Sequence, residues 1–171
     1  SGGQFAYNIG PKGDGTIDEF DSGVVTEVGQ WMARHPDAIT GARPTWFPAP
    51  NWGKVMTKGN DLYFFPELWS PGKTLTLPGV GGHVTGVTVD GTERALEYKQ
   101  DGTTLTVTMS GDNPEPSLRP VIKVTFDAAP TYVPTQTVTA VDGATISSEQ
   151  FLARASALRY SGAQAYDAYL V

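Results

Sequence analysis

Seven short segments that read as β-strands constrain the fold of this chain more than any other feature of its sequence. From residue 53 to about 128 most of these segments alternate between apolar and polar residues, the period of a strand with one buried face. Glycine beside asparagine, aspartate or proline separates the segments, as in hairpin turns. The predicted strands are 54–57, 62–65, 74–77, 84–89, 95–99, 103–109 and 121–126. This pattern predicts a mainly β chain built around an antiparallel β-sandwich.

Composition and charge restrict the partners of the chain. Its 171 residues are 39% hydrophobic and 18% charged, as in an ordinary globular protein. A net charge of −6 without basic clusters argues against binding to nucleic acid or to an anionic membrane surface. No apolar run approaches the length of a membrane span. Because the chain has no cysteine, disulfides and thiolate zinc sites are impossible, and we expect no metal or other cofactor.

The first 34 residues follow a different pattern, that of one strand and one helix. Residues 4–9 (QFAYNI) form a mostly apolar run that predicts a buried strand, and 10–16 form a glycine-rich turn. Residues 18–34 predict a helix, with Thr16 and Glu19 at the spacing of a capping box and His35 followed by Pro36 at its end. One apolar stripe runs along this helix: Phe20, Val24, Val25, Val28, Trp31 and Met32.

This β/α unit cannot bury its own apolar surfaces. A single strand leaves both edges unpaired, and the helix stripe has only that strand to cover. Either other strands of the chain complete the unit, or it is the last piece of a larger α/β fold. The proline- and tryptophan-rich segment 42–52 (ARPTWFPAPNW) is a plausible boundary between this unit and the sandwich.

The stretch KGDGTIDEFD, residues 12–21, resembles a calcium-binding loop in its glycine and acidic residues but not at the first ligand positions. If Gly15 is the glycine at the sixth position of an EF-hand loop, the first and third ligand positions fall on Gly10 and Lys12. A glycine and a cation there remove two of the oxygen ligands that calcium requires. We therefore interpret the stretch as a turn that leads into a helix.

The two histidines and four tryptophans have both a functional and a structural interpretation. His35 and His83 have no acidic partner at ligand spacing, so we expect each to be a surface or helix-end residue. Indole rings stack on sugar rings, but Trp31 belongs to the helix stripe and is predicted to be core. Trp46 and Trp52 bracket the connector and could wedge the two parts together. For Trp69 the sequence allows either sugar stacking or structural packing, and packing is favoured.

Several short motifs together resemble one enzyme family. In chain order they are NIGP at 8–11, GDGTI at 13–17, GQW at 29–31, DAITGARP at 37–44, WGKVMTKGN at 52–60, LTLPG at 75–79 and QDG at 100–102. Their order and spacing resemble the α-L-fucosidases of glycoside hydrolase family 29, over about residues 1–128. Two departures suggest a divergent member: Asp18 stands where the family usually has proline, and QFAYN stands where it usually has NLLLN or NYLLN.

The resemblance implies a fold and an organisation. Its implied fold is an antiparallel β-sandwich preceded by the last β/α unit of a (β/α)₈ barrel. Residues 1–44 would be the last strand and helix of that barrel, 45–52 a connector, and 53–128 the C-terminal sandwich. Residues 129–171 would be a linker and the start of a further module, for which a carbohydrate-binding module is the candidate.

The resemblance also implies a function. The family hydrolyses terminal fucose from glycans with retention, using an aspartate nucleophile and an acid/base that come from barrel strands upstream of residue 1. This segment would then hold no catalytic residue and be inactive alone. Its partners would be fucosylated glycans and the upstream catalytic barrel, and its location secreted, periplasmic or lysosomal. Asn8 and Lys12, at the end of the predicted strand, are the candidate substrate-binding residues. A non-catalytic carbohydrate-binding or structural sandwich is the alternative function.

Overall fold

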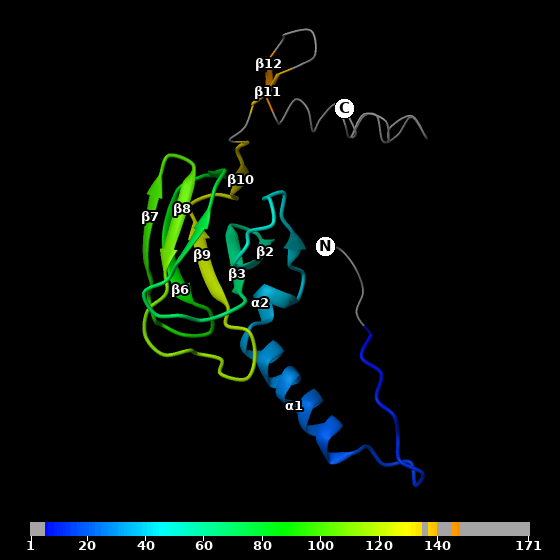
Figure 1. Ribbon diagram of the computed structural model, residues 1–171. Coiled ribbons are helices and arrows are strands. Elements are labelled where there is room, and N and C mark those ends of the chain that lie inside the picture. Colours follow the sequence, from blue (N-terminus) through cyan, green and yellow to red (C-terminus); the bar gives the residue numbers. More distant parts are fainter. Residues whose placement is uncertain (1–5, 135–136, 140–144, 148–171) are drawn as a thin grey trace, which may run out of the picture.

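The computed structural model describes residues 6–134, 137–139 and 145–147, which form a β-sandwich with a helix extending from one end (Figure 1). The helices are α1 (Glu19–Arg34) and α2 (Pro36–Ile39). The longer strands are β2 (Gly53–Lys58), β3 (Asp61–Pro66), β4 (Thr74–Leu77), β6 (Val84–Val89), β7 (Glu97–Asp101), β8 (Thr104–Thr108) and β9 (Ile122–Phe126). The short strands are β1 (Arg43–Pro44), β5 (Val80–Gly81), β10 (Thr131–Tyr132), β11 (Thr137–Thr139) and β12 (Thr145–Ser147).

Two antiparallel sheets make up the sandwich. One has five strands in the order β1-β2-β3-β9-β6, and the other has three in the order β4-β8-β7. The small pairs β5–β10 and β11–β12 are separate from both sheets. Every pairing is antiparallel. The predicted fold class, an antiparallel β-sandwich, is confirmed.

The period-two pattern located the strands closely. Strands β4 and β6 have the predicted bounds, and the other five predicted strands differ by one or two residues at their ends. Strand β7 starts at Glu97 rather than residue 95 because Ala95 bridges to Thr88 and the amide of Leu96 donates to the carbonyl of Val87. These two residues therefore pair with β6 before the chain crosses to the other sheet. The two-residue strands β1, β5 and β10 are too short to show a periodicity.

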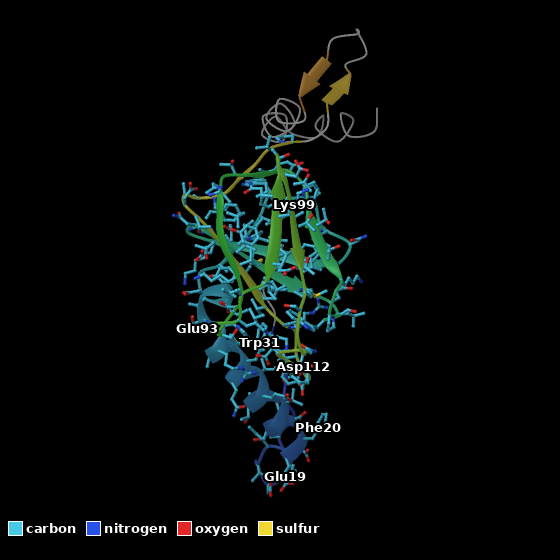
Figure 2. All side chains as sticks on the ribbon, turned by 90° about the vertical axis from the view of Figure 1, so that its left-hand side faces the viewer. Glu19, Phe20, Trp31, Glu93, Lys99 and Asp112 are labelled. Atoms are coloured by element: carbon cyan, nitrogen blue, oxygen red, sulfur yellow. The ribbon has the colours of Figure 1, made fainter. Side chains whose placement is uncertain are left out.

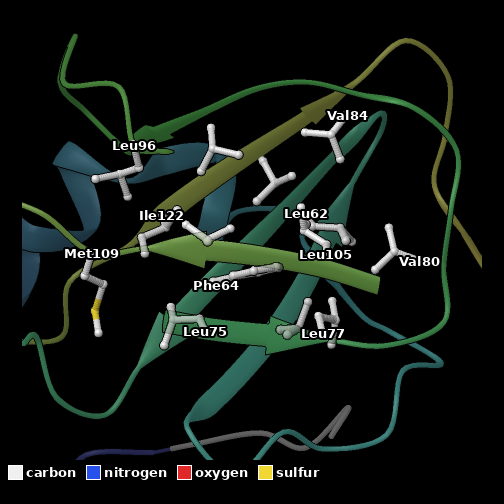
Figure 3. Packing of buried hydrophobic residues seen from close by; sticks show 14 of the residues in the cluster. Leu62, Phe64, Leu75, Leu77, Val80, Val84, Leu96, Leu105, Met109 and Ile122 are labelled. Carbon is white, nitrogen blue, oxygen red and sulfur yellow. The ribbon is translucent and has the colours of Figure 1, made fainter. Parts of the chain in front are cut away.

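The main hydrophobic core lies between the two sheets (Figure 3). The inward-facing residues of alternate positions meet there, among them Leu62 and Phe64 of β3, Leu105 of β8 and Ile122 of β9, all fully buried. Burying aliphatic and aromatic side chains of this size contributes roughly 1.5–3 kcal/mol each. This burial holds the two sheets together.

A second, smaller core lies on the other side of the larger sheet and joins it to the helices. Tyr63 and Phe65 of β3 and Val121 pack with Ala38 of α2, and the half-buried Trp31 of α1 covers them. Burial first, and the nearby carboxylate of Asp61 second, raise the pKa of the Tyr63 phenol well above its ordinary value. The alternation of β3 thus serves two cores, one on each face.

The N-terminal segment differs from the prediction in two respects. Residues 6–9 are not a strand; residues 4 and 5 lie outside the described part of the chain. A barrel strand exists only through hydrogen bonds to neighbouring strands, and the described residues offer it none. The capping box of Thr16 and Glu19 is also wrong. Asp18 caps α1, accepting a hydrogen bond from the Phe20 amide at 2.9 Å, while the Thr16 hydroxyl donates to Asp14.

Strand β10 pairs with β5 in a small sheet of its own. Thr131 and Tyr132 pair with Gly81 and Val80, inside the stretch predicted to be a linker. The predicted helix or strand pair over 147–160 falls outside the described residues, except for Ser147 at the end of β12. Within the described ranges, neither helix is both long and apolar enough to cross a membrane.

Candidate functional site

The loop between residues 10 and 18, where the sequence placed a substrate contact, is a tight turn. The amide of Lys12 donates to the Thr16 carbonyl at 2.7 Å, and the amide of Gly15 donates back to the Lys12 carbonyl at 2.9 Å. Asp14 accepts from both the amide and the hydroxyl of Thr16, and the amide contact first of all lowers the pKa of its carboxyl. Asp14, which precedes Gly15 and would stand at the fifth position of an EF-hand loop, therefore closes its own turn. Within residues 6–134, no group of three or more His, Asp or Glu side chains could hold a metal ion.

The two predicted substrate-binding residues are both on the surface of this segment. Asn8 is exposed, in the irregular run before the turn. Lys12 is exposed in the turn, and its ammonium lies 3.5 Å from the Asp18 carboxylate. The turn therefore ties Lys12 to the start of α1, and both residues are accessible to a ligand or to another part of a protein.

Helix α1 carries an apolar face that no described segment covers. None of its sixteen residues is buried. Phe20 is 75% exposed, and Val25, Val28 and Met32 are between 38% and 44% exposed. Figure 2 shows Phe20 on the part of α1 that extends beyond the sandwich and Trp31 near the end that meets it. A contiguous apolar face of this kind marks an interaction surface. We call Phe20, Val25, Val28 and Met32 the α1 face.

The last turn of α1 is fastened to the sandwich by an ion cluster that sequence spacing did not reveal. His35, which ends α1, is only 2% exposed. Its Nδ1 lies 2.7 Å from Asp90 and its Nε2 lies 3.2 Å from Glu115. Arg34 binds the same Glu115 carboxylate through Nε at 3.0 Å and a terminal nitrogen at 2.7 Å. The helix-end prediction for His35 is correct, but it is a buried residue with two acidic partners rather than a surface one.

Burial and hydrogen bonding act in opposite directions on Glu115. Burial alone would raise the pKa of its carboxyl. Hydrogen bonds from Arg34 and His35, together with their charges, outweigh burial and hold the pKa below its ordinary value. In turn, Glu115 raises the pKa of the Arg34 guanidinium, chiefly through their hydrogen bond. Glu115 is therefore an ionised acceptor at neutral pH.

Two further contacts complete the junction between α1 and the sandwich. The indole nitrogen of Trp31 donates to the Arg119 carbonyl at 2.8 Å, and its ring meets the His35 ring edge-on with centroids 5.3 Å apart. Gly91 packs against the helix end with a φ of 74°, and a Cβ there would come within 3.1 Å of the Arg34 carbonyl oxygen. A glycine is required at this turn both for its left-handed backbone and for the close approach.

The remaining tryptophans divide into packed and exposed rings. Trp52 packs on Phe64 with centroids 5.0 Å apart and donates to the Thr76 carbonyl. Trp69 donates to the Gly111 carbonyl at 2.9 Å, and the Arg94 guanidinium lies 5.3 Å from its ring centroid. The guanidinium covers a face that a sugar would need, so packing is the better interpretation of Trp69.

Trp46 is 88% exposed and lines an open hollow in the surface of the described residues. This hollow of about 790 Å³ lies between segment 41–47, the β2–β3 turn and segment 129–134. The rings of Phe47 and Tyr132, with centroids 5.5 Å apart, form part of its wall. Its mostly apolar lining suits contact with another apolar surface better than ion binding.

Comparisons with known proteins give matches among solved structures alone. No protein-family model matches the sequence, and no curated protein matches it. An α-L-fucosidase of glycoside hydrolase family 29 from Bacteroides thetaiotaomicron matches with a TM-score of 0.60 at 21% identity, over 71% of this chain and 28% of that one. α-L-Fucosidase isoenzyme 1 from Paenibacillus thiaminolyticus matches with a TM-score of 0.60 at 25% identity, over 70% of this chain and 30% of that one.

A third match has the same character. The α-L-fucosidase of a Vibrio species gives a TM-score of 0.67 at 21% identity, over 74% of this chain and 24% of that one. The chain thus spans less than a third of the length of each of these three enzymes. Over some seven tenths of its length, the chain has the fold of a part of the α-L-fucosidases of glycoside hydrolase family 29.

Proposed function

We propose that this chain is the C-terminal portion of a retaining α-L-fucosidase that removes terminal fucose from glycans. In this proposal the chain supplies the last unit of the catalytic barrel and an accessory sandwich, and the catalytic carboxylates lie in the upstream barrel. The fold likeness supports the family. One of the matched fucosidases was solved with a trapped covalent intermediate, and such an intermediate is the signature of retention.

The uncovered α1 face carries the proposal. A surface helix keeps an apolar stripe because something covers it in the working protein. The described residues form two cores, and neither reaches Phe20 or Val25. In a (β/α)₈ barrel the helices lie outside the strands, with their apolar stripes against the sheet and the neighbouring helices. The catalytic barrel is therefore the occupant that we assign to this face.

The division of the chain follows from the same proposal. Residues 1–44 belong to the barrel, 45–52 connect it to the sandwich of 53–128, and 129–171 lead into a further module. We propose a secreted, periplasmic or lysosomal location for the enzyme, in keeping with its glycan substrates.

Asn8 and Lys12 are proposed to lie beside the substrate at the mouth of the barrel. Asn8 follows the residues proposed as the last barrel strand, and active sites of such barrels lie at that strand end. For Asn8, hydrogen bonding to neighbouring barrel loops is the principal role that we assign. Asn8→Ala in the longer enzyme should then lower stability more than substrate affinity. A rise in KM with no loss of stability would instead show direct contact with the sugar.

The test compares the fucosidase activity of this chain with that of a version extended upstream, on an aryl fucoside. We expect activity in the longer form alone. Activity in neither form would favour the alternative, a non-catalytic carbohydrate-binding or structural sandwich. Fucosidase activity of the 171-residue chain by itself would contradict the assignment of the catalytic carboxylates to the upstream barrel.

A further inference from the structure

The contacts between α1 and the sandwich are concentrated at one end of the helix. Trp31, Arg34 and His35 all contact loops of the sandwich, whereas Phe20, four turns away, is three-quarters exposed. A helix of sixteen residues is about 24 Å long, so a small rotation at the attached end moves the free end by several ångströms. The direction of the α1 face therefore depends on how firmly the last turn is held.

The geometry of His35 indicates its protonation state. Both ring nitrogens face carboxylate oxygens, Nδ1 toward Asp90 and Nε2 toward Glu115. An ionised carboxylate only accepts hydrogen bonds, so each ring nitrogen must carry a proton to make both contacts. The doubly protonated ring also balances the charge: the cations Arg34 and His35 match the anions Asp90 and Glu115. A neutral ring would leave one carboxylate in this junction without its hydrogen bond and one negative charge in excess.

We propose that His35 is a positioning residue: as an imidazolium held between Asp90 and Glu115, it fixes the direction of α1, and with it the α1 face, relative to the sandwich. The proposal rests on the proposed function in one respect, that the α1 face has the catalytic barrel as its partner. In the intact enzyme, His35 then aligns the last barrel unit with the sandwich without touching substrate.

Nuclear magnetic resonance of the 171-residue chain tests the protonation state. The chain has two histidines, and His83 is exposed, so it serves as the internal reference. We expect two slowly exchanging ring N–H signals for His35 near about pH 6, and rapid exchange for His83. A single ring N–H signal for His35 under these conditions would overturn the proposal. In Asp90→Asn, which removes one of the two carboxylates, only one slowly exchanging ring N–H signal should remain for His35.

Spin labels test the direction of the helix. The chain has no cysteine, so Ser22→Cys on α1 and Lys99→Cys on β7 provide two unique exposed sites for labelling. We expect a narrow label–label distance distribution in the native chain and a broad one in His35→Gln, with amide exchange in the last turn of α1 faster by about 10-fold or more. His83→Gln is the matched control and should change neither. A narrow distribution in His35→Gln would refute the positioning role.

The two measurements must also agree with each other: a variant that loses one of the two slowly exchanging ring N–H signals should also show a broad label–label distance distribution, and broadening while both signals persist would contradict the proposal. If His35→Gln does not fold, Asp90→Asn provides the same comparison. Both readouts use this chain alone, so they are independent of fucosidase activity. Failure of the activity test would remove the proposed barrel partner and leave the result for His35 intact.

Discussion

Phe20 provides the sharpest test of the proposed docking of α1. Its side chain is 75% exposed in this chain. Complete burial of a phenylalanine contributes roughly 1.5–3 kcal/mol, so covering the exposed three quarters should contribute about 1–2 kcal/mol. Phe20→Ser removes this contribution, and serine and phenylalanine have nearly equal helix propensities. The substitution therefore isolates the surface contact from the stability of the helix.

The prediction is a contrast between two forms of the protein. In the 171-residue chain Phe20→Ser should change the free energy of unfolding by less than about 0.5 kcal/mol, because the ring is already in water. In the longer enzyme the same substitution should lower that free energy by about 1–2 kcal/mol. Urea unfolding followed by tryptophan fluorescence measures both values. Fucosidase activity of the longer form reports whether the barrel remains assembled.

Leu68 is the matched control for this experiment. It is 74% exposed, in the loop after β3. Leu68→Ser should change the free energy of unfolding by less than about 0.5 kcal/mol in both forms. If Phe20→Ser were equally neutral in the longer enzyme, α1 would have no apolar partner there, and the argument for a dependent barrel unit would fail.

Four other predictions concern stability. Leu105→Ala should lower the free energy of unfolding by about 2–5 kcal/mol, since it opens a cavity in the main core, and Gly53→Ala should destabilise because its Cβ would overlap the Phe65 carbonyl; urea titration measures both. Glu115 has a lowered pKa, so its contribution to the free energy of unfolding is complete above pH 4.5 and is lost as the pH falls through the lowered value. On acidification the free energy of unfolding should therefore fall less in Glu115→Gln than in the native chain. Tyr63 has a raised pKa, so its phenol should stay protonated above the ordinary value of 10 in an alkaline ultraviolet titration. Its contribution to the free energy of unfolding is complete below about pH 10 and is lost as the pH rises toward the raised value.

The sandwich could be predicted from sequence because its information is local. A strand with one buried face shows its period directly, and turn residues mark its ends. Strand β3 shows the limit of this approach. Both of its faces are buried, Leu62 and Phe64 in one core and Tyr63 and Phe65 in the other, so it reads as a continuous apolar run. The run predicted the strand without revealing that a second core attaches the helices.

The ion cluster could not be predicted, because its members are far apart in the chain. Asp90 and Glu115 lie 55 and 80 residues beyond His35. Each occupies a turn or loop, where an acidic residue is ordinary. Only the packing of two loops against the end of α1 makes them partners. The one local signal was Asp90-Gly91, a dipeptide that predicted a turn and not its close contact with the helix end.

The helix and the strand of the N-terminal unit differ in what they need from the rest of the protein. A helix satisfies its backbone hydrogen bonds within its own segment, so Asp18 as a cap and one attached end are enough to hold α1 in shape. A strand satisfies them only through its neighbours, and residues 6–9 have no strand partner among the described residues. A piece of a barrel on its own should therefore keep its helix and lose its strand, with the apolar face of the helix in water. These are the features of residues 6–34, and a longer enzyme that completes the barrel would restore both missing contacts at once.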